Sequence, residues 1–114
     1  MIVDTSALMA IVAMEDDAAH YAKAMRDAGE RLAMSAATLV EVTMVAEGRG
    51  GVDMGDRLDE LLSFAGIEVI AVTHGQAERA RAGWRRFGKG RHKAALNLGD
   101  CFAYALAIER DEPL

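Results

Sequence analysis

The stretch IEVIAVTHGQ, residues 67–76, shows most directly how this chain folds. Its first six residues are mostly apolar and β-branched, and they predict the clearest strand in the chain. Thr73 and Gln76 follow with the spacing of a capping box, which predicts that a helix begins immediately after the strand. We expect this helix to run to about Phe87 and to end at Gly88. A strand that leads directly into a helix is the repeating unit of a parallel α/β sheet.

The same alternation of strand and helix extends in both directions from this stretch. Residues 1–3 and 31–34 predict short strands, and residues 7–13 predict a helix. A second helix is expected to begin at residues 15–17 and to end at Gly29, and residues 53–65 have helical spacing. The glycine-rich residues 48–51 predict a loop. A last helix, apolar on almost every face, is expected to follow Asp100. The pattern predicts one α/β domain over residues 1–114 with a central parallel sheet.

The composition is that of a globular protein, with 114 residues, 52% hydrophobic and 27% charged. The single cysteine, Cys101, excludes an internal disulfide and lies in an apolar run, so we expect it to be buried. No segment has the length of a membrane span, and the N-terminus lacks the basic start of a signal peptide. We therefore expect a cytoplasmic protein without membrane contact.

The net charge of −5 is unevenly distributed along the chain. Residues 79–93 contain seven of the 13 basic residues and no acid, which leaves six basic residues against all 18 acids elsewhere. Such asymmetry points to a polyanionic partner, with Arg85, Arg86 and Lys89 among the expected contacts. A solvated helix face explains the same charges equally well.

Three carboxylates lie in segments that otherwise have the character of a protein interior. Asp4 ends the first predicted strand, Glu41 interrupts an apolar helix, and Asp100 precedes the last helix. Local rules broken in buried segments tend to mark function. Asp is also a favoured helix cap, so Asp4 and Asp100 each have a purely structural alternative.

Glu41 lies in the middle of SAATLVEVTMVA, residues 35–46, and its role depends on where that helix begins. If Thr38 is the N-cap, Glu41 closes a capping box and takes no part in chemistry. If Ser35 is the N-cap, Glu41 lies on the second turn, inside the helix, and needs a partner. The sequence leaves both starts open.

The position of these carboxylates in a parallel sheet favours a shared site. Ligands of such sheets bind beyond the carboxyl ends of the strands, where Asp4, Glu41 and Asp100 are all expected. Three carboxylates gathered in an apolar setting repel one another unless a cation neutralises them. Oxygen ligands without a nearby Cys or His pair select a hard ion, so we expect Mg²⁺ or Mn²⁺ rather than zinc.

Three motifs in this order, MIVDTSAL, SAATLVEV and NLGDCFAYALA, resemble those of the PIN-domain ribonucleases, and in particular the VapC-type toxins of bacterial toxin–antitoxin pairs. The resemblance covers essentially the whole chain. It implies a three-layer α/β/α fold and metal-dependent cleavage of RNA. Asp4, Glu41 and Asp100 match the acidic metal-binding residues of the family, and Ser6 matches the hydroxyl that supports the first Asp. Arg91 and Lys93 fall where the family places basic residues near the RNA.

The resemblance also implies partners and one departure from the family. Such toxins usually pair with a small VapB-like antitoxin and often form homodimers. The family usually continues past Pro113 through another strand that often carries a further acid, so we expect the last strand to be missing here. The alternative to an enzyme is therefore a catalytically incompetent PIN-fold binding protein that keeps only its partner surface.

Overall fold

The structure is a computed structural model, which describes residues 1–28, 31–90, 92–94 and 96–113. Five helices and two strands follow one another along these residues. Their bounds are α1 (Thr5–Val12), α2 (Ala18–Asp27), β1 (Ala33–Ser35), α3 (Ala36–Ala65), β2 (Glu68–Ile70), α4 (His74–Phe87) and α5 (Leu98–Arg110).

The strands form a small parallel sheet. β1 pairs with β2 so that Ala33 lies opposite Glu68 and Ser35 lies opposite Ile70. The N-terminal residues extend this sheet on the other side of β1, because Ile2 forms a parallel bridge with Ala33. The Ile2 amide donates in turn to the Pro113 carbonyl at 2.8 Å, so the C-terminal segment lies beside the N-terminal one.

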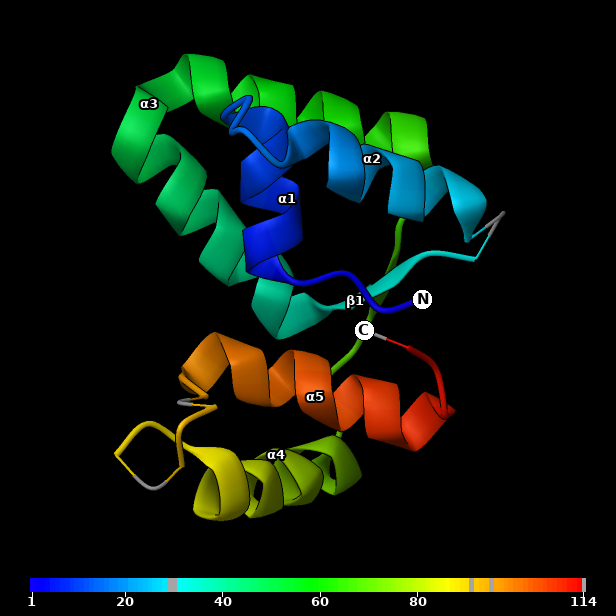
Figure 1. Cartoon of the computed structure of the whole chain (residues 1–114), viewed down its shortest axis with the longest axis vertical. Coiled ribbons are helices and arrows are strands. Elements are labelled where there is room, and N and C mark those ends of the chain that lie inside the picture. Colours follow the sequence, from blue (N-terminus) through cyan, green and yellow to red (C-terminus); the bar gives the residue numbers. More distant parts are fainter. Residues whose placement is uncertain (29–30, 91, 95, 114) are drawn as a thin grey trace.

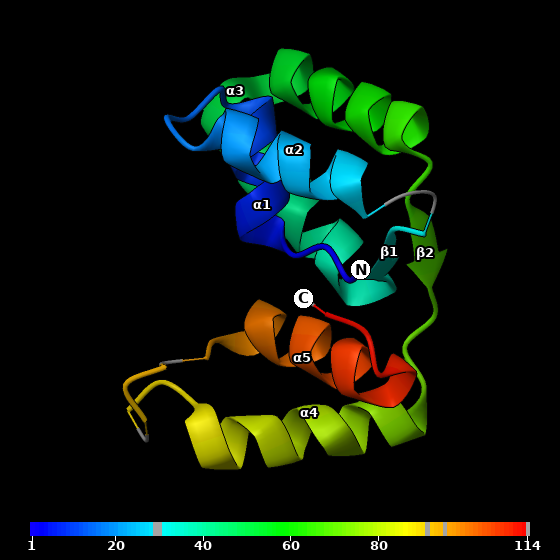
Figure 2. The same cartoon turned by 45° about the vertical axis from the view of Figure 1, so that its right-hand side comes forward.

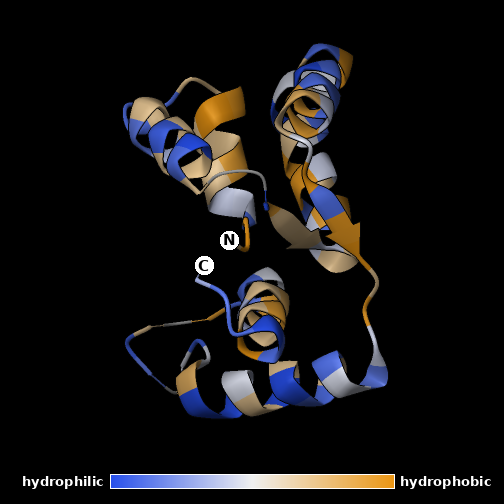
Figure 3. Ribbon diagram, turned by 90° about the vertical axis from the view of Figure 1, so that its right-hand side faces the viewer, coloured by the Kyte–Doolittle hydropathy of each residue, from blue (hydrophilic) through white to orange (hydrophobic). Residues whose placement is uncertain are grey.

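Helices lie on both sides of this sheet (Figures 1 and 2). On one side α1 packs against α2 and α3, and on the other side α4 packs against α5. The larger core lies among the first three helices and includes Leu8, Met34, Val42 and Leu58. The colouring of Figure 3 shows that α4 is largely hydrophilic, whereas the strands are hydrophobic. These observations confirm the α/β class with parallel strands flanked by helices.

Several element boundaries differ from those that the sequence predicted. The strand expected over residues 67–72 covers only Glu68–Ile70. The backbone after it bonds to the first turn of α4 instead, because the Ala71 carbonyl accepts a hydrogen bond from the Gln76 side chain at 3.2 Å. The second helix begins at Ala18 rather than at residues 15–17, and the first strand after it covers Ala33–Ser35 rather than residues 31–34. The predicted end at Gly29 lies outside the described residues.

The glycine-rich segment 48–51 is a kink in a helix rather than the loop that we expected. α3 continues through it, and only Gly51 leaves the helical conformation, with φ 64° and ψ −153°. This combination is open essentially to glycine alone. The kink lets the two arms of α3 take different directions (Figure 1), and the second arm packs Leu58 into the larger core.

The cap of α4 forms as predicted, but only in part. The Thr73 hydroxyl accepts a hydrogen bond from the Gln76 amide at 3.1 Å, and Gly88 follows the helix as its C-cap. The buried Gln76 side chain does not return to the Thr73 amide. It donates to the Ala71 carbonyl and, at 2.8 Å, to Glu109 on α5, so it ties α4 to α5 instead of closing a capping box.

Within the residues that the structure describes, no helix is both long enough and apolar enough to cross a membrane.

Candidate active site

The start of α3 places Glu41. Ser35 is the N-cap, and its hydroxyl accepts a hydrogen bond from the Ala37 amide at 3.1 Å. Of the two starts that the sequence allowed, the structure therefore has the one in which Glu41 lies inside the helix and is free of any capping box. Thr38, the rival cap, is buried in the first turn.

The Glu41 carboxylate is held by two other elements. The Thr5 hydroxyl, at the start of α1, donates a hydrogen bond to Oε1 of Glu41. On the opposite side the carboxylate lies directly against Gly99 in the first turn of α5, where an added Cβ would come within 2.1 Å of both carboxylate oxygens. The half-buried carboxylate is thus fixed at the junction of α1, α3 and α5.

Asp100 lies on the same first turn of α5, but it does not begin the helix as we expected. Asn97 is the N-cap, and Asp100 occupies the third helical position. The two residues form a reciprocal capping box: Asp100 Oδ2 accepts from the Asn97 amide at 3.1 Å, and Asn97 Oδ1 accepts from the Asp100 amide at 2.9 Å. A carboxylate at this position suits the positive end of the helix dipole.

Asp4 is the N-cap of α1. Its Oδ1 accepts a hydrogen bond from the Ala7 amide at 2.9 Å, which is the structural role that the sequence allowed. The side chain lines a pocket beside α2 with His20 and Tyr21. The neighbouring Thr5 is the residue that contacts Glu41, so Asp4 stands one residue away from the Glu41 contact.

Glu41 and Asp100 line one groove, which we call the carboxylate groove. It has a volume of about 270 Å³ and is lined by Thr5, Ser6, Met9, Glu15, Glu41, Val45, Arg49, Asn97 and Asp100. The exposed Ser6, which we expected to support Asp4, lies at this groove. The hydrogen bond that Asp4 accepts comes from the Ala7 amide instead.

The carboxylate groove has the donor chemistry of a hard cation. Mg²⁺ is usually bound through one or two protein carboxylates, and water and substrate phosphate complete its coordination. Glu41 and Asp100 supply such a pair. Among the described residues no group of three or more His, Cys, Asp and Glu side chains lies close enough to hold an ion. Asp4, which lines the pocket beside α2, therefore does not form a three-carboxylate cluster with this pair in the described residues.

A second groove lies on the other side of the first turn of α5, and we call it the α4–α5 groove. It has a volume of about 460 Å³ and is lined by Ala77, Ala80, Arg81, Trp84, Arg85, Leu98, Cys101 and Phe102. Neighbouring residues at the start of α5 therefore line different grooves. Asn97 and Asp100 line the carboxylate groove, and Leu98 and Cys101 line the α4–α5 groove.

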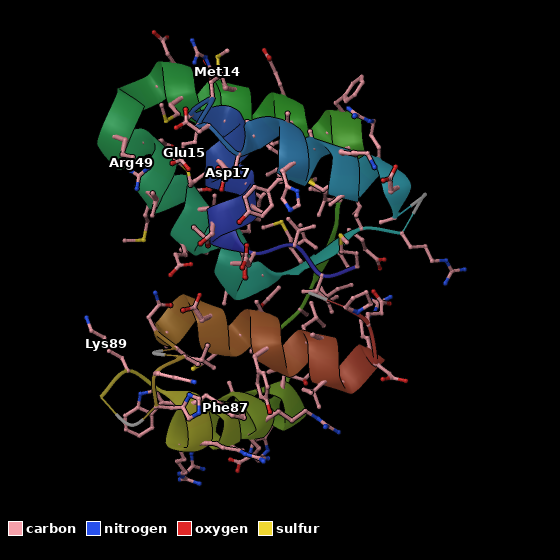
Figure 4. The ribbon with its side chains drawn as sticks, viewed as in Figure 1. Met14, Glu15, Asp17, Arg49, Phe87 and Lys89 are labelled. Carbon is pink, nitrogen blue, oxygen red and sulfur yellow. The ribbon has the colours of Figure 1, made fainter. Side chains whose placement is uncertain are left out.

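The described basic residues predicted to contact RNA lie on the surface of α4 and of the segment after it, and Arg85 lines the α4–α5 groove. Arg85, Arg86, Lys89 and Lys93 are all exposed, and the Arg86 guanidinium lies over the Phe87 ring at 5.1 Å from its centre. Figure 4 shows Phe87 and Lys89 at this end of the molecule. Arg91 was also predicted to contact RNA, but it lies outside the described residues.

Cys101 is buried, as predicted, and is a free thiol. Burial, together with the negative charge of the adjacent Asp100, raises its pKa above the ordinary value. A thiol with a raised pKa is protonated at neutral pH and is a poor nucleophile. Cys101 is therefore a packing residue of the α4–α5 groove.

Three residues of the carboxylate groove, Thr5, Glu15 and Arg49, were missed in the sequence, and so was Gly99, which lies against the Glu41 carboxylate. The contacts of Thr5 and Gly99 with Glu41 join distant parts of the chain, and no local pattern signals them. Glu15 and Arg49 form an ion pair at 3.5 Å between the loop after α1 and the first arm of α3 (Figure 4). Arg49 follows Glu41 at a helical spacing of eight residues, a signal that the predicted loop at residues 48–51 concealed.

Comparison with known proteins identifies the family of this chain. The family model for the PIN domain matches residues 1–114. The chain therefore belongs to the PIN-domain family. It is 46% identical over 114 residues to a protein named ribonuclease VapC from Mycolicibacterium smegmatis, covering all of this chain and 88% of that protein. It is 45% identical over 114 residues to ribonuclease VapC30 and 49% identical over 115 residues to ribonuclease VapC28, both from Mycobacterium tuberculosis, covering all of this chain and 86% of each of those proteins.

Proposed function

We propose that this chain is an endoribonuclease, the toxin of a toxin–antitoxin pair, and that it cleaves RNA in the carboxylate groove with the help of Mg²⁺ or Mn²⁺. The observation that carries the proposal is the pairing of Glu41 and Asp100 in one groove, on the flank of the helix turn that also borders the basic α4–α5 groove. The similarity to proteins named ribonuclease VapC supports the reaction type.

Glu41 and Asp100 would hold the divalent ion, and Asp4 would join them from the cap of α1. When bound, such an ion provides an activated water at neutral pH and neutralises charge on the scissile phosphate. The protein's own contribution is to keep the carboxylates in place. The Thr5 hydroxyl orients one oxygen of Glu41, and the capping box fixes Asp100. Because Gly99 has no side chain, the Glu41 carboxylate can lie against the backbone of α5.

The basic surface of α4 would hold the RNA backbone. Arg85 and Trp84 line the α4–α5 groove, and Arg86, Lys89 and Lys93 are exposed on α4 and the segment after it, with Arg91 as a further contact in the same stretch. Contacts of this kind are with phosphate and weaken as salt rises. Leu98 lines the α4–α5 groove, and the adjacent Asn97 lines the carboxylate groove. An RNA strand that crosses the first turn of α5 would therefore reach from one groove into the other.

The test replaces Asp4 with Asn. Asn is as good an N-cap as Asp, so Asp4→Asn removes the charge and keeps the cap of α1. We expect cleavage of a single-stranded RNA in Mg²⁺ or Mn²⁺ to be lost while the melting temperature stays unchanged. A matched control is Asp17→Asn at the N-cap of α2, where the side chain makes no capping hydrogen bond. Full activity of Asp4→Asn would exclude a role for Asp4 in binding the ion.

We also propose that the protein works in the cytoplasm, pairs with a VapB-like antitoxin and forms a homodimer. Large apolar side chains on its surface support protein partners: Phe64 is 94% exposed, Leu98 76% and Met44 70%. Co-expression with the product of an adjacent antitoxin gene should yield a complex that co-purifies. Light scattering of the toxin alone should give the mass of two chains. The mass of one chain would exclude the homodimer and leave the antitoxin proposal standing.

The alternative of an incompetent binding protein is not favoured. The relatives that match this chain along its whole length carry the name ribonuclease. Glu41 and Asp100 also both line the carboxylate groove.

A further inference from the structure

Arg49 is the basic side chain of the carboxylate groove, and the proposed function has not used it. Among the described residues that line this groove, every other side chain is acidic, polar or apolar. Glu41, Val45 and Arg49 follow one another at intervals of four residues, so they form one line along the first arm of α3. The groove therefore has Glu41 towards one end of this line and the Arg49 guanidinium, paired with Glu15, towards the other.

Two backbone features fix Arg49 at that end. The first is the break at Gly51, which stops the helical arm two residues after Arg49. The second is the tight turn after α1, where Met14 adopts a left-handed conformation with φ 55° and the Glu15 amide donates to the Ala10 carbonyl at 2.8 Å. This turn brings Glu15 to face Arg49, as Figure 4 shows.

The ion pair between Glu15 and Arg49 is weak enough for a better ligand of Arg49 to displace Glu15. The two side chains are 46% and 57% exposed, and their nearest charged atoms are 3.5 Å apart. Exposed pairs of this kind contribute at most about 1 kcal/mol. A phosphate offers a guanidinium a bidentate and shorter contact than this carboxylate does. Glu15 therefore occupies Arg49 in the free protein without holding it strongly.

We propose that Arg49 binds an RNA phosphate that flanks the scissile one, and that Glu15 competes with RNA for it. This inference rests on the proposed function. Eight residues of helix separate Glu41 from Arg49 by about 12 Å. That distance is several times the rise of about 3.4 Å per nucleotide of a stacked strand, so Arg49 meets a different nucleotide from the one that is cleaved. Arg49 is thus a positioning residue that sets where the strand lies in the groove.

The experiment measures binding of a fluorescent single-stranded oligoribonucleotide to the full chain, in EDTA and at several salt concentrations. Arg49→Ala should weaken binding about tenfold at low salt and reduce the salt slope by about 0.7, the value for one contact with a single strand. The matched control is Arg57→Ala, because Arg57 is an exposed residue of the other arm of α3 and does not line the groove. It should change affinity less than twofold.

Variants of Glu15 separate phosphate binding from a merely structural ion pair. Glu15→Gln should tighten RNA binding up to about fivefold, because it releases Arg49, and this gain should disappear in the Arg49→Ala background. Asp16→Asn, at the neighbouring exposed acid, controls for the loss of one negative charge. A purely structural pair would lower thermal stability in Glu15→Gln without tightening RNA binding. That result would overturn the inference even if Arg49→Ala failed to fold.

The outcomes also distinguish this inference from the proposed function. A wild-type chain that cleaves RNA, with equal affinities for Arg49→Ala and Arg57→Ala, overturns the role of Arg49 alone. A chain that binds RNA through Arg49 but cleaves none in Mg²⁺ or Mn²⁺ overturns the proposed catalysis alone. A chain that does not bind RNA overturns both.

Discussion

The carboxylate groove and the α4–α5 groove share the first turn of α5, but their side chains are held in different ways. In the first, Glu41 is fixed by Thr5 and Gly99, and Asp100 is fixed by its capping box with Asn97. In the second, the basic residues of α4 stand exposed on the surface. The difference suits a division of labour, because catalytic groups require a preorganised geometry, whereas phosphate contacts tolerate mobile cations.

The largest effect is expected from removing one charge in the fixed groove. Glu41→Gln keeps the size of the side chain and an oxygen that can accept the Thr5 hydrogen bond, but it loses the charge. We expect kcat to fall at least about 100-fold, which corresponds to about 2.7 kcal/mol, because charge stabilisation at the ion is lost. Cleavage assays with a melting curve check this result. Glu47→Gln, on the same arm of α3 and exposed, is the control and should be fully active.

Gly99→Ala tests whether the fixed position of Glu41 matters in itself. The added Cβ would meet both carboxylate oxygens, so the flexible end of Glu41 must move. We expect activity to fall about 10- to 100-fold. The melting temperature should hold or rise slightly, since alanine favours a helix by up to about 1 kcal/mol over glycine. Undiminished cleavage would show that Glu41 does not need this position, and the contrast between the two grooves would disappear.

Gly51→Ala tests the scaffold of the fixed groove. The φ and ψ of Gly51 are strained for any other residue, so we expect a loss of about 1–3 kcal/mol in the free energy of unfolding. Gly48→Ala is the matched control, because Gly48 lies three residues earlier with helical geometry and open space around it. It should be neutral or stabilising by up to about 1 kcal/mol. Chemical denaturation gives the free energy of unfolding of both variants. Equal values would show that the fold does not depend on the conformation of Gly51 at the kink.

A smaller and graded effect is expected in the exposed region. The double variant Arg85→Ala and Arg86→Ala should weaken RNA binding and reduce the salt slope by about 1.4, two contacts with a single strand, while kcat stays nearly unchanged. Arg26→Ala with Arg57→Ala removes the same charge from exposed positions of α2 and α3 and is the control. A loss of kcat equal to that of Glu41→Gln would contradict the division between the two regions.

The smallest effect concerns the chain ends, outside both grooves. The N-terminal ammonium forms an ion pair with Glu112 at 3.0 Å, and this contact lowers the pKa of Glu112 below its ordinary value of 4.5. A lowered pKa means that the pair stabilises the fold above that value and that its contribution is lost as pH falls through the folded pKa. Glu112→Gln should therefore lower the melting temperature slightly at pH 7, and this loss should shrink as the pH falls below 4.5. A loss that does not change with pH would contradict this origin.

The sequence predicted the strand-to-helix order and the identity of the acids better than their contacts. Local signals are strong where one residue decides a local conformation: Thr73 is the cap of α4, and Gly88 ends that helix. The choice between Ser35 and Thr38 as the cap of α3 stayed open in the sequence, and the structure has Ser35. The capping box of Asn97 and Asp100 has the right spacing, but Asp100 was taken for the residue that precedes the helix, whereas Asn97 has that place. Gly51 misled the prediction, because a glycine cluster signals a loop and a helix kink alike.

Contacts between distant segments could not be predicted in this way. Thr5 is 36 residues from Glu41, and Gly99 is 58 residues away, so their contact depends on how α1, α3 and α5 pack. Asp4 shows the same limit. The sequence allowed Asp4 to be either a helix cap or an ion ligand. In the structure Asp4 caps α1, and the next residue, Thr5, makes the contact with Glu41.

The central claim is that Glu41 and Asp100 together bind the divalent ion that RNA cleavage requires. Calorimetric titration of Mn²⁺ into the full chain tests it most directly, with Glu41→Gln and Asp100→Asn as the variants and Asp17→Asn as the control. The account predicts that the wild type and the control bind Mn²⁺ at millimolar concentrations or below and that each of the two groove variants binds it at least tenfold more weakly. No binding by the wild type at millimolar Mn²⁺, or equal binding by all four proteins, would contradict it.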